Sequence, residues 1–159
     1  MSFYIGVGIV LVQGDKYVLV QEVRHEKKDL YNLPAGTLES NEDLMSCIVR
    51  ETEEETGASI SLEYFVGIYQ TVLANGNNIL FSVFAATISQ EVQFHSEEHT
   101  VVKALTYDEI ASLSAAGQLR APTVLKAIDD YRSGQRLPLS SVQSWHLDSL
   151  SAITVDKDH

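Results

Sequence analysis

Three glutamates near the middle of this 159-residue chain are the side chains best suited to chemistry. On a helical wheel of about 100° per residue, Glu51, Glu54 and Glu55 fall within an arc of about 100°. Apolar side chains of the two preceding turns occupy nearly the same sector: Leu44, Cys47 and Ile48. The three carboxylates therefore continue the face with which such a helix would pack on a core.

Carboxylates gathered on a partly buried face repel one another and lose hydration, which is unfavourable unless a proton or a cation compensates. Mg²⁺ binds carboxylate oxygens and keeps waters and substrate phosphates as its remaining ligands. A solvated acidic helix end is the alternative, because most charged runs lie on the surface. The glutamates alone leave this alternative the more common one; if they bind a metal, Mg²⁺ is the expected ion, with Mn²⁺ as a possible substitute.

The residues around the glutamates complete a longer pattern. Gly36 precedes Glu42 by six positions, seven residues separate Glu42 from Arg50, and Glu54-Glu55-Thr56-Gly57-Ala58 ends the array. Residues 36–58 resemble the Nudix hydrolase signature Gly-x5-Glu-x7-Arg-Glu-U-x-Glu-Glu-x-Gly-U, in which U is a bulky aliphatic residue. All seven fixed positions match. Thr52 and Ala58 depart from the aliphatic preference, which bears on local packing more than on catalysis.

The resemblance implies a fold and a set of roles. Nudix hydrolases are α/β/α sandwiches with a mixed β-sheet, so an α/β (α+β) fold of that type is expected. By the same resemblance Glu51, Glu54, Glu55 and the carbonyl of Gly36 hold the metal. Glu51, Glu54 and Arg50 are then catalytic residues, and Arg50 and Glu42 orient the carboxylates.

A further carboxylate is expected from a loop that precedes a later strand, because family members use such a group as a metal ligand or general base. Glu98 is the preferred catalytic residue for this role, and Glu97 is its rival. His95 or His99 could carry protons there. The choice between Glu97 and Glu98 stays open.

Other segments resemble the NudJ-type phosphatase subgroup of the Nudix family: 32–36, 119–122 and 131–139. That subgroup releases orthophosphate from nucleoside tri- and diphosphates and from the pyrophosphates of thiamine and its hydroxymethylpyrimidine precursor. In this reading Tyr31 stacks on a substrate ring and Arg24 contacts the distal phosphate. A core tyrosine and a solvated surface arginine are the respective alternatives.

Two other functions remain open at this point. A Nudix hydrolase of different specificity would cleave ADP-ribose, a dinucleoside polyphosphate or an oxidised nucleotide, and the shared signature does not discriminate among these. A non-catalytic nucleotide-sensing domain is the alternative from another class, although such domains usually lose signature carboxylates. The physiological substrate and the choice between orthophosphate and pyrophosphate as product stay open.

Composition limits the partners. The formal net charge is −11, so nucleic acid and anionic membranes would be repelled, and a small phosphorylated molecule is the expected partner. Cys47 is the only cysteine, which excludes an intrachain disulfide and favours a reducing cytoplasmic location. The apolar stretch 3–12 lacks the features of a signal peptide. A monomer is expected, with a dimer as the open alternative.

The elements that must position these residues follow from periodicity and breakers. Strands are predicted at 3–12, 17–23, 60–71, 79–89 and 101–105. Helices are predicted at 40–56, 108–116 and about 121–133, the first with a capping box from Ser40 to Asp43 and a stop at Gly57. Residues 24–36 are expected to form a loop. The whole chain, 1–159, is expected to be one domain, and the order of the tail after Trp145 stays open.

Overall fold

Two long apolar strands form the centre of the fold. In the computed structural model, which describes residues 2–21, 30–97 and 101–148, β1 (Phe3–Gln13) runs parallel to β6 (Asn78–Ile88) along its whole length. Both strands are buried over most of their length, as near-continuous hydrophobic strands should be when a sheet is covered on both faces.

The other strands pair antiparallel around this centre. The sheet order is β3-β2-β1-β6-β5, with β4 also on β1 and β7 also on β2. The remaining strands are β2 (Lys16–Gln21), β3 (Tyr31–Asn32), β4 (Ala35–Thr37), β5 (Tyr64–Val72) and β7 (Val101–Thr106). Only the β1–β6 pair is parallel among the described strands, so the expected mixed sheet is confirmed.

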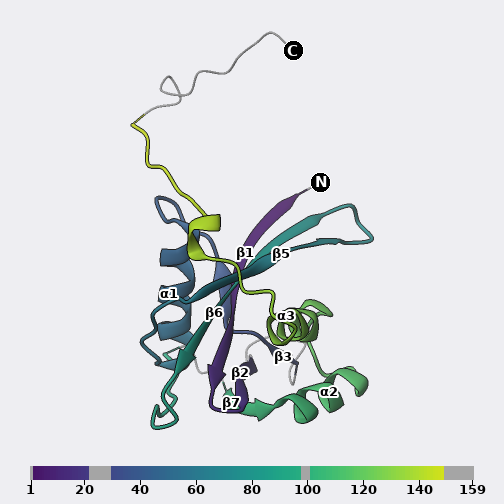
Figure 1. Cartoon of the computed structure of the whole chain (residues 1–159). Helices are drawn as coiled ribbons and strands as arrows, with labels where there is room; N and C mark the ends of the chain where they lie inside the picture. Colours follow the sequence, from purple (N-terminus) through teal and green to yellow (C-terminus); the bar gives the residue numbers. More distant parts are fainter. Residues whose placement is uncertain (1, 22–29, 98–100, 149–159) are drawn as a thin grey trace.

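Helices cover both faces of the sheet (Figure 1). The helix α1 (Leu44–Thr56) packs on one face, and α2 (Tyr107–Ala115) and α3 (Thr123–Arg132) lie on the other. Alternate residues of β1 divide between the two cores, because successive side chains of a strand point to opposite faces. Val7, Ile9 and Leu11 join the α1-side core with Cys47, whereas Val10 joins the α3-side core.

The segment expected to be a loop contains two short strands. β3 pairs with Val20 and Gln21, and β4 pairs with residues 6–8 of β1, while the carbonyl of Pro34 between them accepts from Ile9 N at 3.1 Å. The loop expectation for 32–36 was therefore wrong. Pro34 and Gly36 suggested a break, but the open edge of β1 supplies backbone partners that no local pattern reveals.

The first helix begins later than predicted. Asp43 is its N-cap and accepts a hydrogen bond from Ser46 N at 2.8 Å, so the cap proposed at Ser40 was wrong. Asn41 has a φ of 62°, a left-handed conformation that stops the helix from extending toward Ser40. Gly57 ends the helix as predicted, with a φ of 75°.

The remaining elements follow the predictions with shifts at their ends. The strand expected at 60–71 begins only at Tyr64, and the last helix covers Thr123–Arg132. Among the described residues no helix is long and apolar enough to cross a membrane.

Candidate active site

The helix α1 carries its glutamates at three levels of burial. Glu55 is 5% exposed, while the side chain of Glu51 is 12% exposed and that of Glu54 is 33% exposed. Glu53, on the other side of the helix, is exposed. The helical face that packs on the sheet through Cys47 and Ile48 thus continues into carboxylates, as the wheel indicated, and these carboxylates lie at different depths.

Arg50 connects the acidic side chains. Its guanidinium donates two hydrogen bonds to Glu42, from Nε to Oε1 at 2.7 Å and from Nη2 to Oε2 at 3.1 Å. Its Nη1 donates to Glu51 Oε1 at 2.9 Å and to Glu54 Oε2 at 3.2 Å. A forked pair with one carboxylate fixes the plane of the guanidinium. Glu42 therefore holds Arg50, and Arg50 holds Glu51 and Glu54.

The charge states of this network follow from its contacts. The hydrogen bond from Arg50 lowers the pKa of Glu42 to about 2, against the opposing effect of burial. The same bond raises the pKa of Arg50 above its usual value. Glu39, which the sequence analysis did not single out, places Oε1 3.7 Å from Arg50 Nη2, but its side chain is largely exposed.

Gly36 lies against the carboxyl group of Glu51. A Cβ atom built on Gly36 would stand 2.0 Å from Glu51 Cδ and 2.2 Å from its Oε1. Gly36 lies in β4, opposite Val7 of β1, and its neighbour Ala35 donates from its backbone N to Glu55 Oε1 at 3.1 Å. The sheet edge and the helix thus bring backbone atoms and two carboxylates together, across fifteen or more residues of sequence.

The loop before β7 runs along the last turn of α1. The backbone N of His95 donates to Thr56 O at 3.0 Å, and that of Glu97 donates to Glu54 O at 3.1 Å. These bonds satisfy carbonyls that a helix end otherwise leaves unpaired. A surface hollow beside them is lined by residues of the helix and the loop: Met45, Ser46, Val49, Arg50, Glu53, Glu54 and Glu97.

The loop contacts bear on the predicted base. Glu97 is exposed and lies at the hollow beside Glu54. The side chain of His95 packs over Gly57, where an added Cβ would meet its Nδ1 at 2.1 Å. Glu98, His99 and the predicted phosphate contact Arg24 lie outside the described residues.

Tyr31 lies in the hydrophobic core, which was the alternative to its predicted stacking on a substrate ring. Its side chain is 8% exposed and belongs to the α3-side core, and Lys103 Nζ lies 5.6 Å from the ring centroid. A ring that stacks on a substrate needs an open face. The structure therefore shows Tyr31 as a core residue.

The donor set suits a divalent cation, although the side chains are not arranged around one point. Among the described residues, no three His, Cys, Asp or Glu side chains form a ready metal cluster. Arg50 already donates hydrogen bonds to the carboxylates of Glu51 and Glu54, and the backbone N of Ala35 donates one to Glu55. Carboxylate oxygens are nevertheless the ligands that Mg²⁺ prefers. Four glutamates lie within 4 Å of the single guanidinium of Arg50, namely Glu39, Glu42, Glu51 and Glu54, so the site has an excess of negative charge.

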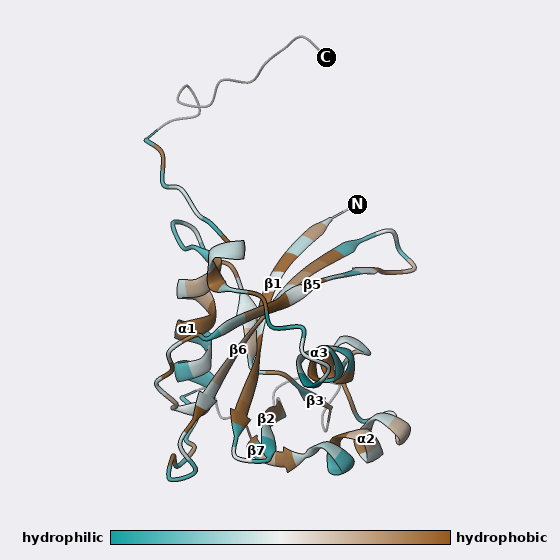
Figure 2. Ribbon diagram, in the orientation of Figure 1, coloured by the Kyte–Doolittle hydropathy of each residue, from teal (hydrophilic) through white to brown (hydrophobic). Residues whose placement is uncertain are grey.

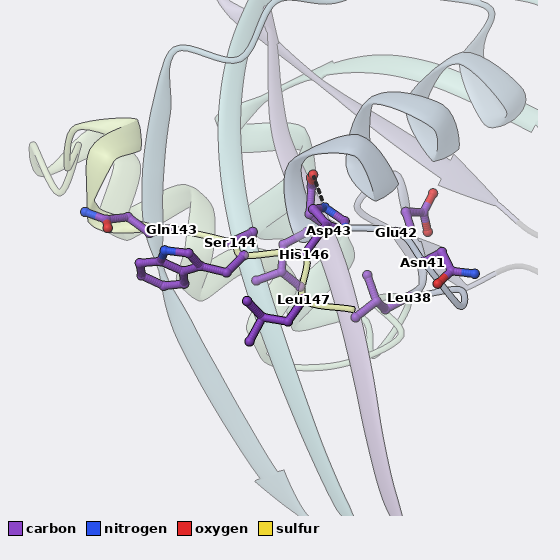
Figure 3. Close-up of a pocket in the computed structure, with 10 residues that line it drawn as sticks. Leu38, Asn41, Glu42, Asp43, Gln143, Ser144, His146 and Leu147 are labelled. Carbon is purple, nitrogen blue, oxygen red and sulfur yellow. Dashed lines mark ion pairs between the residues drawn. The ribbon is translucent and has the colours of Figure 1, made fainter. Parts of the chain in front are cut away.

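A second hollow lies at the other end of α1, where the C-terminal segment passes (Figure 3). His146 Nε2 lies 3.9 Å from Asp43 Oδ2 in this hollow. The pKa of Asp43 is lowered, chiefly by its hydrogen bond from the backbone of Ser46. Figure 3 shows His146 beside Asp43, whereas Gln143 points away from the loop that precedes α1; the other lining residues of the hollow are Leu38, Asn41, Glu42, Leu44, Ser144, Trp145 and Leu147.

Known proteins are similar to this chain in both sequence and fold. Residues 3–127 match the family model of the NUDIX domain. Phosphatase NudJ of Escherichia coli is 32% identical over 141 residues, which span 87% of this chain and 90% of NudJ. A NUDIX hydrolase from Nitrosomonas europaea superposes with a TM-score of 0.76 at 31% identity, over 89% of this chain and 97% of that one.

A more distant neighbour shares the fold alone. The NUDIX domain of Shewanella oneidensis NrtR, solved with ADP-ribose, has a TM-score of 0.64 at 19% identity and covers 84% of this chain and 88% of its own. Its fold agrees with the sandwich described above.

Proposed function

This chain belongs to the NUDIX hydrolase family, and from that premise we propose that it is a Mg²⁺-dependent phosphohydrolase that releases orthophosphate. The proposed substrates are nucleoside tri- and diphosphates and thiamine-type pyrophosphates. The proposed enzyme is one domain, 1–159, in a reducing cytoplasm, which suits the single buried cysteine.

One observation carries the proposal. Arg50 joins Glu42, Glu51 and Glu54 in a single hydrogen-bonded network, and the backbone of Gly36 lies against Glu51. Glu51, Glu54, Glu55 and the Gly36 carbonyl are the proposed metal ligands. When Mg²⁺ is bound, it would neutralise phosphate oxygens and lower the pKa of a water molecule.

The chain's own residues would position that chemistry. Glu42 keeps the guanidinium of Arg50 in one plane, and Arg50 restrains the carboxylates of Glu51 and Glu54. A carboxylate of the loop before β7 would accept the proton of the attacking water. Glu98 remains the preferred residue and Glu97 its rival, and the position of Glu97 at the hollow supports the choice of this loop.

No protein nucleophile is required. Cys47 is completely buried, and this burial raises the pKa of its thiol to about 12. A thiol of that pKa stays protonated near neutral pH and is a poor nucleophile. The proposed route is therefore direct attack of water on phosphorus.

The likeness to NudJ, whose name describes a phosphatase, supports orthophosphate release over pyrophosphate release. Cleavage of ADP-ribose, of dinucleoside polyphosphates or of oxidised nucleotides is the competing specificity. A nucleotide sensor without turnover is the alternative from another class. The complete set of signature glutamates counts against it, because a sensor has no need of the network around Arg50.

The test is hydrolysis in ¹⁸O-labelled water of thiamine pyrophosphate, hydroxymethylpyrimidine pyrophosphate, a nucleoside triphosphate and ADP-ribose, each with Mg²⁺. Attack at the terminal phosphorus places the label in orthophosphate, and this is the expected result. Label in the monophosphate of a triphosphate, with free pyrophosphate, would contradict the NudJ-like specificity. Absence of turnover on every substrate would support the sensor.

A further inference from the structure

Beyond α1, one face of the sheet carries exposed apolar side chains from three adjacent strands. Register places them on that face: Ile5 of β1 lies beside Leu80 of β6, which lies beside Gln70 of β5. Side chains two residues apart on a strand share a face. The resulting apolar patch consists of Phe3, Ile5, Ile68, Val72 and Leu80.

All five side chains of the patch are exposed. Phe3, Val72 and Ile68 are 69%, 64% and 59% exposed, and the other two members are more than two-fifths exposed. The outer ends of β1, β5 and β6 project beyond the helices (Figure 1), and apolar segments mark them (Figure 2). Soluble monomers rarely expose contiguous apolar patches beyond roughly 300–600 Å², and those of that size often mark interaction sites.

The same strands are free of charge. Residues 2–14 and 64–90 contain no Asp, Glu, Lys, Arg or His, although the whole chain has a net charge of −11. Two copies of so acidic a protein repel each other over most of their surface. This repulsion is weakest where both contacting faces are uncharged. A second copy of the chain meets that condition, because it would contact this face through the same uncharged face of its own.

The patch borders an open strand edge. β5 is the last strand of the sheet, with β6 along one of its edges. On its other, outer edge, the described residues pair with it only near its start, where Phe65 and Leu137 exchange backbone hydrogen bonds. Gln135 Nε2 also donates to Val66 O there. From Gly67 to Val72 the outer edge has no strand partner among the described residues. The segment also lacks the charges and prolines with which edge strands usually block pairing.

The hairpin geometry identifies which backbone groups face outward. Leu73 N donates to Asn77 O, so Leu73 directs its backbone groups toward the β6 side of the hairpin, and so does every second residue before it on β5. In an antiparallel pair these directions alternate along the strand. The backbone groups of Ile68, Gln70 and Val72 therefore point away from the sheet, while two of these three side chains belong to the apolar patch.

We propose that a second copy of this chain docks on this edge, with the two β5 strands antiparallel about a two-fold axis at Gln70. Ile68 would then face Val72 of the partner subunit, and the apolar patches would form one surface. Three outward residues per strand give about six backbone hydrogen bonds across the axis. An isologous interface of this kind closes on itself and forms a dimer rather than a filament.

A stable dimer needs a contact larger than a few side chains. A standard interface buries roughly 800 Å² per partner. The five exposed side chains of the patch would form the apolar centre of the contact, and the open strand edge beside them would enlarge it. If the proposal holds, a dimer takes the place of the monomer expected from the sequence. It rests on other residues than the proposed catalytic network, so either proposal can fail without the other.

The first test is the oligomeric state of the full chain by sedimentation equilibrium. A species of twice 17.6 kDa is expected for the unaltered protein. Ile68→Glu should shift it to monomer because it places like charges near the axis, whereas Leu147→Glu, at a similarly exposed position off the sheet, should leave the dimer intact. Both variants should keep hydrolytic activity and a normal thermal melt. A monomeric unaltered chain, or an Ile68→Glu variant that still dimerises, overturns the proposal.

The second test fixes the register. With Gln70 on the axis, the two Cα atoms of this residue stand about 5.5 Å apart, within the range that a disulfide spans. Gln70→Cys should therefore form an intermolecular disulfide under mild oxidation, and buried Cys47 should not compete. Failure to cross-link contradicts the axis. Dimerisation only after removal of residues 149–159 would show that the chain's own C-terminal segment covers the patch, which also overturns the proposal.

Discussion

Glu54 is the most exposed of the three glutamates proposed to bind metal, and it accepts a hydrogen bond from Arg50. Its substitution should separate catalysis from folding. Glu54→Gln preserves volume but removes the negative charge, so turnover should fall by about 100-fold or more while the thermal melt changes little. Steady-state kinetics in excess Mg²⁺ provide the measurement.

The control for this substitution is Glu53→Gln on the same helix. Glu53 is exposed, has no place in the Arg50 network described above, and lines the same hollow. It should retain nearly full activity. Wild-type turnover by Glu54→Gln would remove Glu54 from the metal site.

Gly36 offers a test in which the backbone rather than a carboxylate is changed. Its φ is not in the left-handed region, so alanine fits the backbone, but the new Cβ would stand 2.0 Å from Glu51 Cδ. Because the conflict lies at the end of a flexible side chain, Glu51 should move at a small cost in stability. Gly36→Ala should therefore lose most of its kcat and little of its melting temperature.

Thr37→Ala is the matched control, since Thr37 is the exposed neighbour on β4. It should behave as the unaltered enzyme in both measurements. Full activity of Gly36→Ala would show that the position of Glu51 against this backbone does not matter for turnover.

At the scale of the elements, one buried carboxylate joins α3 to the sheet. Asp130 accepts hydrogen bonds from Lys126 Nζ and from Tyr69 Oη of β5, each at 2.7 Å. The hydrogen bond from Lys126 lowers the pKa of Asp130 below its ordinary value of 3.8, burial acts in the opposite direction, and the hydrogen bond from Tyr69 lowers this pKa further. Lys126 is mostly exposed, so the bond from Tyr69 should contribute more of the stability.

This network predicts a pH dependence with a definite sign. A depressed carboxyl pKa contributes stability that is fully present above the ordinary value of 3.8 and is lost as the pH falls through the lower, folded value. Asp130→Asn should destabilise the protein by about 1–3 kcal/mol near neutral pH. The difference in melting temperature between the two proteins should narrow below about pH 4.

Thermal melts from pH 7 to pH 3 provide this measurement. Tyr69→Phe and the double variant complete a thermodynamic cycle, in which the paired losses should be less than additive. A constant difference between Asp130→Asn and the unaltered protein across the whole range would contradict the titration of Asp130.

For the whole molecule, metal removal and unfolding should be separate events. The two apolar cores, one on each face of the sheet, contain none of the proposed metal ligands. EDTA should therefore abolish hydrolysis and leave the far-ultraviolet circular dichroism and its cooperative melt in place. Added Mg²⁺ should restore activity, and a cooperative loss of the dichroism on chelation would show that the metal is structural.

The sequence alone determined whatever depends on neighbours along the chain. Glu51, Glu54 and Glu55 share a helical face because of their spacing, and burial in the structure follows that wheel. Gly57 ends the helix for a local reason, its left-handed φ. The mixed sheet between helices was expected from the family resemblance, and the order of the predicted elements agrees with it.

Only the tertiary structure decided the contacts between distant segments. β4 exists because the edge of β1 accepts it, and that pairing places Gly36 against Glu51. Tyr31 is a core residue because β3 joins the edge of β2, which no local signal reports. The apolar patch likewise depends on the register among three strands. Strands pair through backbone groups that can be far apart in the sequence, so no local pattern reports which residues become neighbours.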